Sequence, residues 1–498
     1  FPPEYGGQGL PMALSMAAFE IWTAANMSFG LCPMLNQGAI EAIKRHGTDE
    51  QKSIYLEKMI AGEWVGTMNL TEPNAGSDLG VLRCRATLQK DGSYHIKGSK
   101  IFITYGEHDW TNNIIHLVLA RTLDAPEGSR GISLFIVPKF LVTEDGSLGE
   151  RNDLKCVSLE HKVGIHASPT CVMAYGDNDE CVGYLVGEEN KGLGYMFTMM
   201  NNERLAVGIQ GVAIADRAFQ QALEYAQERK QGKSLRSGAG PDSSIIEHAD
   251  IRRMLMTMKA HAEAARAITY LTAGYIDVAD HHKDDAASDM AADFVELLTP
   301  VAKAWSTDIG FEMASIGVQV HGGLGYIEET GAAQYMRDIR IAPIYEGTNG
   351  IQAVDLALRK LPMKGGAVVR NFVELIRSFV DSIDDCGSSE LQALRPALEQ
   401  AVEALSEATE WMLKQVTESP NDCAAGASPY LRLFAIVAGG YLLAKGAVAA
   451  LKKSSEEGDG DAFFASRRAV ALFYSEQILP VATSLVSAVT AGDEMLYS

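Results

Sequence analysis

Residues 343–350 read Pro343-Ile344-Tyr345-Glu346-Gly347-Thr348-Asn349-Gly350, a single carboxylate in an apolar run beside a glycine turn. A partly desolvated carboxylate titrates closer to neutral pH, which suits a general base. A more ordinary alternative is a glutamate at a helix N-terminus, where the helix dipole stabilises its charge. Chemistry alone favours the ordinary alternative, so the surrounding sequence has to decide the role of this stretch.

Helical patterns flank the stretch on both sides. Upstream, helices are predicted from Gly192-Leu193-Gly194 to about Leu361, with one apolar stripe formed by Leu205, Ile209, Val212, Ala215, Phe219 and Leu223. Downstream, Lys364-Gly365-Gly366 is typical of a linker, and Ser428-Pro429 predicts the start of a helix. A bundle seam in this added region is predicted from Leu391, Leu394, Leu398, Val402, Leu405, Thr409, Met412 and Val416.

The N-terminal third divides into helices and strands. Over residues 10–62 a helical face is predicted from Met12, Met16, Phe19 and Trp22, and Thr48-Asp49-Glu50-Gln51 is a capping sequence. From about Val65 to Leu185 the pattern alternates around turns such as Asp91-Gly92, which predicts a mostly antiparallel β domain. The expected class is α+β, mainly α, with domains at 1–65, 66–185, 186–362 and 363–498.

Composition excludes several classes of protein. The 498 residues are 47% hydrophobic, and 43 Lys and Arg against 64 Asp and Glu give a net charge of −21. That charge argues against broad binding to nucleic acids or anionic membranes. The apolar run Leu433–Ala444 is shorter than the roughly 20 residues of a membrane span, so it predicts a buried helix rather than a span.

Cysteine and histidine spacing bears on compartment and metals. The seven cysteines are scattered and predict reduced thiols and a cytoplasmic protein. His281-His282 is more typical of a solvated loop than of a ligand pair, and no metal is expected. The sequence begins Phe1-Pro2-Pro3, so a targeting segment ahead of it remains an open alternative.

Two glycine-bearing segments are candidate binding loops. The polar loop Leu70–Asp78 could turn backbone N–H groups toward a flavin or a phosphate, or could be a plain connector. Gln319–Tyr326 follows a helical stretch rather than a strand, which argues against a Rossmann fingerprint. Close approach to a pyrophosphate and a simple helix-to-helix turn are equally compatible with this second segment.

Together these motifs resemble the acyl-CoA dehydrogenase family. The resemblance runs from Phe1 to about Leu361 and rests on motifs in family order: Pro3–Gly7, Thr71–Asp78, Lys100–Thr104, Gln319–Gly323 and Arg337–Thr348. It implies the family fold of N-terminal helices, a middle β domain and a C-terminal four-helix bundle. The region after Leu361 resembles the added helical domain of a long form of the family.

The resemblance implies a reaction and reverses the preference at Glu346. Glu346 aligns with the base that removes the α-proton of an acyl-CoA thioester, while a hydride leaves the β-carbon for FAD and a trans-2-enoyl-CoA forms. The enolate oxygen would accept hydrogen bonds from the backbone N–H of Glu346 and a ribityl hydroxyl of FAD. A short- or medium-chain acyl-CoA is expected, with 3-methylthiopropionyl-CoA among the candidates.

The same resemblance implies binding residues. Those expected at FAD are Met68, Leu70, Thr71, Gly76, Ser77, Phe102, Ile103, Thr104, Arg229, Gln319, Gly322, Gly323 and Thr348. Gln319, Gly322 and Gly323 would reach the FAD pyrophosphate across a subunit interface. Those expected at the substrate are Ser77, Asn201, Arg204, Tyr345 and Gly347. The segment Arg229-Lys230-Gln231-Gly232-Lys233 departs from the family pattern beyond Arg229, so the resemblance implies a contact to a partner's FAD for Arg229 alone in this segment.

Partners and alternatives follow by analogy. Electron-transfer flavoprotein is the expected electron acceptor, and the added domain favours a homodimer. An acyl-CoA oxidase, which reoxidises its flavin with O2, is an alternative with the same fold and base. A non-catalytic flavin-binding scaffold would need a basic surface and no base at position 346, and the sequence has neither.

Overall fold

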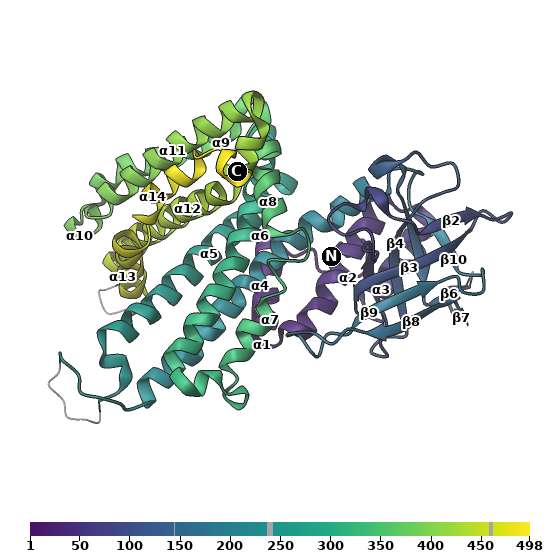
Figure 1. The fold of residues 1–498 in the computed structure, drawn as a ribbon, viewed down its shortest axis with the longest axis horizontal. Helices are drawn as coiled ribbons and strands as arrows, with labels where there is room; N and C mark the ends of the chain where they lie inside the picture. The colour runs from purple at the N-terminus through teal and green to yellow at the C-terminus, as the bar shows by residue number, and fades with distance from the viewer. Residues whose placement is uncertain (144, 237–242, 458–461) are drawn as a thin grey trace. The chain divides into compact units, whose positions relative to one another are not determined.

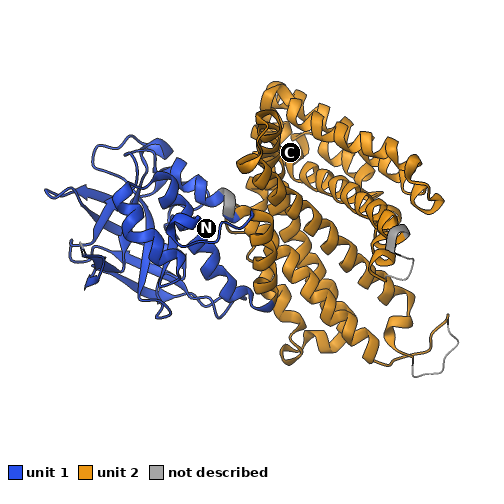
Figure 2. Cartoon of the chain, turned by 180° about the vertical axis from the view of Figure 1, so that it is seen from behind, with its two compact units in different colours: residues 1–11, 25–203 blue, residues 12–24, 204–498 orange. Residues whose placement is uncertain are grey.

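The computed structural model describes residues 1–143, 145–236, 243–457 and 462–498, apart from the side chains of 201, 202 and 455–457. Within this part of the chain two units are distinguished by their internal contacts (Figure 2). Unit 1 comprises Phe1–Pro11 and Ala25–Glu203, and unit 2 comprises Met12–Ala24 and Arg204–Ser498. Each unit is described by itself.

Unit 1 joins two helices to a β domain. Helix α2 (Met27–His46) starts at Asn26, whose side chain accepts a hydrogen bond from the backbone of Phe29. Helix α3 (Asp49–Ile60) starts with the capping box predicted at Thr48, which satisfies N–H groups that the first turn leaves open. The strands are β1 (Trp64–Asn69), β2 (Arg85–Leu88), β3 (Tyr94–Thr104), β4 (Asn113–Ala120), β5 (Ser133–Pro138), β6 (Phe140–Val142), β7 (Leu148–Arg151), β8 (Leu154–Leu159), β9 (Thr170–Tyr175) and β10 (Val182–Leu185).

The main sheet has the strand order β1-β4-β5-β10-β3-β9-β8, with β2 paired to β3, and β6 and β7 form a separate two-stranded sheet (Figure 1). The pairs within it are antiparallel, as the sequence predicted, except that β1 runs parallel to β4. Alternate residues of the strands fill a buried core that includes Ile96, Ile103, Phe135 and Met173. This core fixes which side chains of β3 remain available to a ligand.

Unit 2 is helical. Helix α4 (Gly192–Glu228) begins in unit 1 and continues in unit 2. The other helices are α1 (Met12–Ala25), α5 (Ala249–His281), α6 (Asp285–His321), α7 (Ala332–Ile339), α8 (Asn349–Asp355), α9 (Ala367–Ser382), α10 (Ser389–Gln392), α11 (Arg395–Glu418), α12 (Pro420–Glu457), α13 (Ala462–Gln477) and α14 (Val481–Val489). Helices α5 and α6 run side by side (Figure 1), and α6 carries the buried groups described below.

Helix α1 clusters with unit 2, although the sequence predicted a single N-terminal helical domain over residues 1–65. The Asp277 carboxylate on α5 accepts hydrogen bonds from the backbone N–H groups of Met12 and Ala13. Glu20 accepts from Arg266 at 2.7 Å, also on α5. The first backbone amides of α1 and the Glu20 side chain thus link α1 to α5, and sequence periodicity does not reveal these contacts. Trp22, expected on the buried face, is 52% exposed.

The added domain, α9 to α14, packs on the preceding bundle through buried aromatic rings. The ring of Phe372 on α9 lies 5.5 Å from Phe294 on α6 and 5.4 Å from Phe434 on α12. The predicted helix start at Ser428-Pro429 is wrong, because α12 runs unbroken through Pro429. Proline removes one backbone donor, and packing along a helix of 38 residues offsets that single loss.

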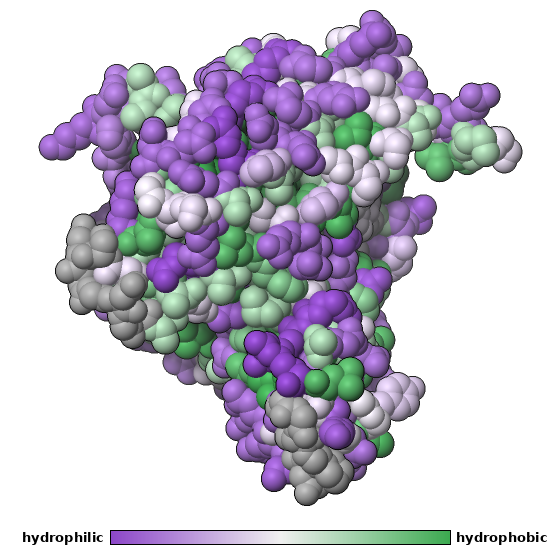
Figure 3. Space-filling model, turned by 90° about the vertical axis from the view of Figure 1, so that its left-hand side faces the viewer, coloured by the Kyte–Doolittle hydropathy of each residue, from purple (hydrophilic) through white to green (hydrophobic). Residues whose placement is uncertain are grey.

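Within the described residues, α12 is also the one unbroken helix with the length and apolarity of a membrane span, over Pro420–Ser454. Of its most apolar window, 67% is buried inside the structure, as in the core helix of a helical bundle. Helices α13 and α14 pass the same test only when taken together as a bent pair. Figure 3, which faces the side that carries α10 and α13 in Figure 1, shows hydrophobic residues interspersed with hydrophilic ones.

Candidate active site

The loop that carries Glu346 has a strained backbone. Glu346 has φ 53° and Gly347 has φ 82°, so two consecutive residues lie in the left-handed region. This region costs a non-glycine residue free energy, and such strain is concentrated at functional sites. The φ of Gly347 favours glycine, and a Cβ on residue 347 would also lie 2.6 Å from the amide Nε2 of Gln352, which would have to shift. The Glu-Gly order is therefore required by the geometry of the turn.

A lysine beneath this loop holds it in place. Lys303 on α6 is fully buried, and its Nζ donates to the backbone oxygen of Gly347 at 2.8 Å and to Asn349 Oδ1 at 2.9 Å. Sequence reasoning missed Lys303. The signal was present, because this lysine falls in the apolar stretch Leu297–Ala304 of a predicted helix, where a charge has to find partners.

Asn349 completes the attachment of the loop to α6. Its Nδ2 donates to the backbone oxygen of Ala304 at 3.0 Å, to Thr307 Oγ1 at 3.0 Å and to Asp308 Oδ1 at 2.7 Å. Its backbone N–H donates to Pro343 O at 3.0 Å, which closes the loop on itself. The base loop, residues 343–349, is thus anchored from both its carbonyl and its side-chain groups.

Thr348 has two possible uses. Its hydroxyl oxygen accepts the N–H of Ile351 at 3.2 Å and so caps α8. A capping hydroxyl still has its own proton to donate, so it can also serve the predicted contact to FAD. The neighbouring Tyr345 donates its hydroxyl proton to Gln210 on α4, which fixes the other side of Glu346.

Two cationic side chains act on Glu346. Burial lowers the pKa of Lys303 to about 7, against the opposing attraction of Glu346 and Asp308. Burial also lowers the pKa of Arg204 from its ordinary value, with Asp355 and Glu346 opposing that shift. Nearby positive charge favours the ionised form of a carboxylate, which is the form that accepts a proton. Arg204, predicted at the CoA moiety, therefore lies close enough to influence the base.

In unit 1, a buried ion pair fixes the predicted flavin loop, which is the polar loop Leu70–Asp78. Lys100 Nζ on β3 donates to the backbone oxygen of Leu70 at 3.0 Å and to Glu72 Oε1 at 2.8 Å. The other contacts of Glu72 are backbone N–H groups, from Arg83 at 2.6 Å and Cys84 at 3.0 Å. Both charged side chains are almost fully buried. Sequence reasoning missed this pair also, because lysine and glutamate usually indicate surface positions.

The tip of the flavin loop stays open. Gly76 and Ser77 are exposed, and a Cβ on Gly76 would meet no atom within 4 Å. Of the other residues predicted there, Leu70 is buried, and Met68 and Thr71 are partly buried. The loop therefore presents backbone and hydroxyl groups at its tip while its base is fixed by Lys100.

A bulge in β3 turns Phe102 outward. Pairing with β9 shifts register between Lys100 and Ile103, and Phe102 has φ 60°. Bulges of this kind re-aim side chains next to functional sites. Phe102 is 59% exposed whereas Ile103 is 1% exposed, so Ile103 can reach a ligand only through its backbone. Thr104 is partly buried and pairs with Thr170.

A polar network joins β1 to β4 and β9. Thr67 Oγ1 is 2.7 Å from His116 Nδ1, and Asn69 donates to Thr67 Oγ1 at 2.8 Å and accepts from Tyr175 at 2.7 Å. Burial lowers the pKa of His116 to about 3, so its ring is neutral at ordinary pH. The network fixes the strand that leads into the flavin loop.

The turn after α6 is the third predicted binding segment. Gln319, Gly322 and Gly323 are exposed, and a Cβ on either glycine would meet no atom within 4 Å. Gly322 has φ 61° and ψ −140°, a conformation essentially reserved for glycine. His321 beside it is buried and stacks on Tyr225 with ring centroids 4.5 Å apart. The turn thus offers open backbone on a fixed support.

The remaining predicted residues divide between the units. Arg229 lies exposed just after α4, where its backbone oxygen accepts from Ile245 at 2.8 Å. The side chain of Asn201 lies outside the described residues. Unit 1 holds Met68, Leu70, Thr71, Gly76, Ser77, Phe102, Ile103, Thr104 and Asn201, and unit 2 holds Arg204, Arg229, Gln319, Gly322, Gly323, Tyr345, Glu346, Gly347 and Thr348.

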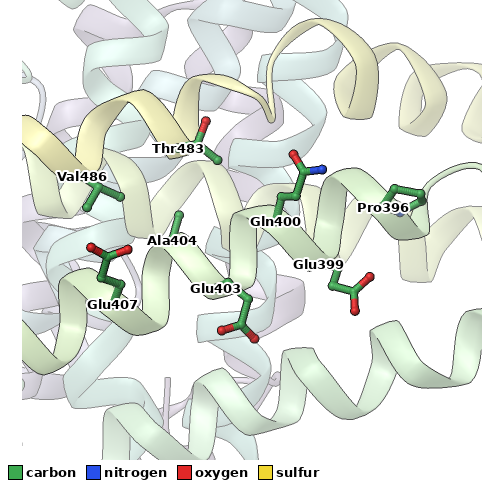
Figure 4. Close-up of a pocket in the computed structure, with 8 residues that line it drawn as sticks. All are labelled: Pro396, Glu399, Gln400, Glu403, Ala404, Glu407, Thr483 and Val486. Carbon is green, nitrogen blue, oxygen red and sulfur yellow. The ribbon is translucent and has the colours of Figure 1, made fainter.

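A groove elsewhere in unit 2 has a different character. It lies between α11 and α14 in the added domain (Figure 4) and is lined by Pro396, Glu399, Gln400, Glu403, Ala404, Glu407, Thr483 and Val486. Three of these residues are glutamates, and Glu403 pairs with Arg377 at 3.0 Å. This negative lining is unsuited to a phosphate-bearing ligand.

Family models account for nearly the whole chain. The N-terminal, middle and C-terminal domains of acyl-CoA dehydrogenase match residues 1–63, 67–177 and 190–361, and an acetyl-CoA dehydrogenase C-terminal-like domain matches 372–498. The chain belongs to the acyl-CoA dehydrogenase family. The family predicted from the sequence is thereby confirmed.

Individual relatives of this acyl-CoA dehydrogenase family member are consistent with the match to the family models. The chain is 48% identical over 496 residues to 3-methylmercaptopropionyl-CoA dehydrogenase of Ruegeria pomeroyi, covering 99% of this chain and 83% of that one. It is 36% identical to a butyryl-CoA dehydrogenase of Syntrophomonas wolfei, covering 97% and 80%.

A solved structure confirms the predicted fold class. The acyl-CoA dehydrogenase of Bacillus anthracis complexed with FAD superposes with TM-score 0.77 at 22% identity, covering 98% of this chain and 79% of that chain. At this identity the likeness shows the fold alone, and it extends over the added helices α9 to α14.

Proposed function

We propose that this chain catalyses the FAD-dependent α,β-dehydrogenation of an acyl-CoA thioester, with Glu346 as the base. The observation that carries the proposal is the loop itself. A single carboxylate stands on a left-handed turn, influenced by Lys303 and Arg204 and fixed by hydrogen bonds to α6. Membership of the acyl-CoA dehydrogenase family supplies the reaction type.

The residues present suit FAD in chemical character. Phe102 offers an exposed aromatic face, and Ser77 and Thr348 offer hydroxyl groups. Gly76, Gly322 and Gly323 offer backbone with open space where a Cβ would stand. Open glycine turns allow N–H groups to approach phosphate oxygens closely. We expect the Gly322 turn to serve the FAD of a second subunit in a homodimer.

The chain's own groups perform the proton chemistry. The Glu346 carboxylate accepts the α-proton, and the backbone N–H of Glu346 donates to the thioester oxygen as negative charge develops there. One such donor contributes about 3–4 kcal/mol in comparable oxyanion sites. FAD, when bound, supplies the acceptor for the hydride that leaves the β-carbon. Fixed orientation of the carboxylate by α6 reduces the entropic cost of the proton transfer.

The proposal also covers the substrate, the electron acceptor and the location of the protein. The greater identity to a 3-methylmercaptopropionyl-CoA dehydrogenase than to a butyryl-CoA dehydrogenase favours a short acyl group with sulfur in the chain. Electron-transfer flavoprotein is the proposed electron acceptor, with O2 as the alternative of an oxidase. The seven thiols, none of them in a disulfide, support the proposal of a cytoplasmic location.

An anaerobic screen tests the function. The purified holoenzyme is mixed with 3-methylthiopropionyl-CoA and with straight-chain acyl-CoAs of increasing length, and loss of the flavin's visible absorbance is followed with product analysis. We expect reduction and a trans-2-enoyl-CoA with at least one short substrate. Reoxidation in air with stoichiometric peroxide would favour the oxidase, and no reduction by any acyl-CoA would contradict the proposal.

A further inference from the structure

A fully buried lysine supports the turn of the catalytic base. Lys303 reaches the backbone oxygen of Gly347, one residue after Glu346, and the side chain of Asn349, three residues after it. Neither acceptor is charged. Burying a lysine against neutral oxygens lowers the stability of the fold, so a functional role for its charge would explain its presence.

The groups around Lys303 define its electrostatic setting. Glu346 from the base loop and Asp308 from its own helix stabilise its positive charge, and Arg204 from α4 opposes it. Two further charged groups on helices that contact α6 have ion-pair partners of their own: Arg432 of α12 pairs with Glu312 at 2.8 Å, and Asp355 of α8 pairs with Arg359 at 3.0 Å. Burial lowers the pKa of His261 on α5, which leaves it neutral. Glu346 is therefore the carboxylate that most strongly favours the charged form of Lys303.

We propose that Lys303 is the positioning residue of the base, holding the Glu346–Gly347 turn in its left-handed conformation and stabilising the carboxylate form of Glu346. The proposal rests on the function assigned to Glu346. Lys303 acts through the loop and has no contact with a reacting atom. Its removal should affect the rate constant of proton abstraction far more than the binding of substrate.

The first test is Lys303→Met, which keeps the length of the side chain and removes its donors and charge. We expect normal FAD content, a kcat lowered by about ten- to a hundredfold, and KM within about threefold of wild type, because a displaced base slows reaction without weakening binding. Lys259→Met is the matched control: this partly buried lysine on α5 donates to Ser466 at 2.8 Å, away from the loop. It should leave kcat unchanged.

The pH profile separates positioning from simple structural support. Loss of the positive charge should move the acid limb of kcat to higher pH by about one pH unit in Lys303→Met, because the carboxylate loses a stabilising cation. Lys303→Arg retains charge and should keep the acid limb at the wild-type pH. An unmoved limb in Lys303→Met, or wild-type kcat in that variant, would overturn the proposal.

A measurement on the wild type avoids any variant that fails to fold. Hydrogen exchange of the backbone amides in residues 343–352 of the apoprotein reports how firmly the loop is held. Opening of the loop would hydrate the Lys303 amine and raise its pKa, so the charged form favours the open loop. These amides should therefore gain protection relative to those of α3 between about pH 6 and about pH 8, and equal relative protection at both values would contradict the attachment of the loop to Lys303.

Failure of this inference differs from failure of the proposed function. The exchange measurement contains no substrate, so it tests the attachment of the loop even when no acyl-CoA reduces the flavin. Conversely, normal flavin reduction by Glu346→Gln would remove the base from the mechanism and leave the exchange result standing.

Discussion

Each unit of this acyl-CoA dehydrogenase family member uses a fully buried lysine to hold a functional loop, but the two lysines have different partners. In unit 1, Lys100 holds the backbone oxygen of Leu70 and is neutralised by Glu72 at 2.8 Å. In unit 2, Lys303 holds the backbone oxygen of Gly347 and donates to a neutral amide oxygen. A lysine paired with a carboxylate makes a permanent anchor, whereas one held by neutral oxygens stays responsive to pH and to the charge of Glu346.

The largest expected effect is on the permanent anchor. Lys100→Met leaves the Glu72 carboxylate buried without its cation, which should lower the free energy of unfolding by about 3–5 kcal/mol. Lys97→Met is the matched control on the same strand, because Lys97 forms an exposed pair with Asp179 and should cost less than about 1 kcal/mol. Thermal unfolding followed by circular dichroism measures both. Equal midpoints for the two variants would show that the buried pair does not anchor unit 1.

The second effect is on the base turn. Gly347→Ala places a Cβ at the strained φ of 82° and 2.6 Å from Gln352 Nε2, so the turn or the Gln352 side chain has to shift. We expect kcat to fall by about a hundredfold with FAD retained. Gly350→Ala, in the first turn of α8, meets no atom closer than 3.9 Å and should leave kcat unchanged. Stopped-flow flavin reduction compares them, and similar rates for both variants would contradict the requirement for this turn.

The two units should also differ in their response to pH. Burial lowers the pKa of Lys303 from 10.5 to about 7 and that of His116 in unit 1 from 6.5 to about 3. Between the lowered pKa and the ordinary pKa of each group, the unfolded chain binds more protons than the folded chain, so the free energy of unfolding rises with pH. This pH window runs from about 7 to 10.5 for Lys303 and from about 3 to 6.5 for His116. Thermal midpoints against pH should become flatter in the alkaline window for Lys303→Met and in the acid window for His116→Gln. A flatter acid window in Lys303→Met and a flatter alkaline window in His116→Gln would show that these groups do not control the two windows.

The smallest effect concerns two helix caps. Thr48→Ala removes the capping box of α3, and Thr348→Ala removes the cap of α8. Each should cost about 1 kcal/mol of stability. Only Thr348→Ala should also weaken FAD binding, measured by titration of the apoprotein, because Thr348 is proposed to contact the cofactor. Equal FAD affinity in both variants would restrict Thr348 to its capping role.

Local signals allowed much of the fold to be predicted. Short-range chemistry explains the capping box at Thr48. It also explains the linker between helices at Lys364-Gly365-Gly366, where all three residues have positive φ. The start proposed at Pro429 failed because packing along α12 outweighs one missing donor. The association of α1 with α5 depends on Asp277, more than 260 residues away in sequence, and no local pattern reveals it.

The candidate site was predicted unevenly for a related reason. Glu346 and the glycine turns are visible as motifs, because their chemistry lies within a few consecutive residues. Lys100 and Lys303 are not, since a lysine becomes an internal anchor only when the fold brings backbone oxygens within reach of its amine. Such residues can be sought in sequence as charges within apolar runs, and their partners come only from the structure.

Anaerobic flavin reduction in a single variant tests whether Glu346 is the base of a flavin-dependent acyl-CoA dehydrogenation. Wild type and Glu346→Gln, both loaded with FAD, are mixed anaerobically with the best acyl-CoA of the substrate screen, and the flavin absorbance is followed. We expect rapid bleaching in wild type and none on the same timescale in Glu346→Gln. Bleaching of Glu346→Gln at the wild-type rate would contradict it.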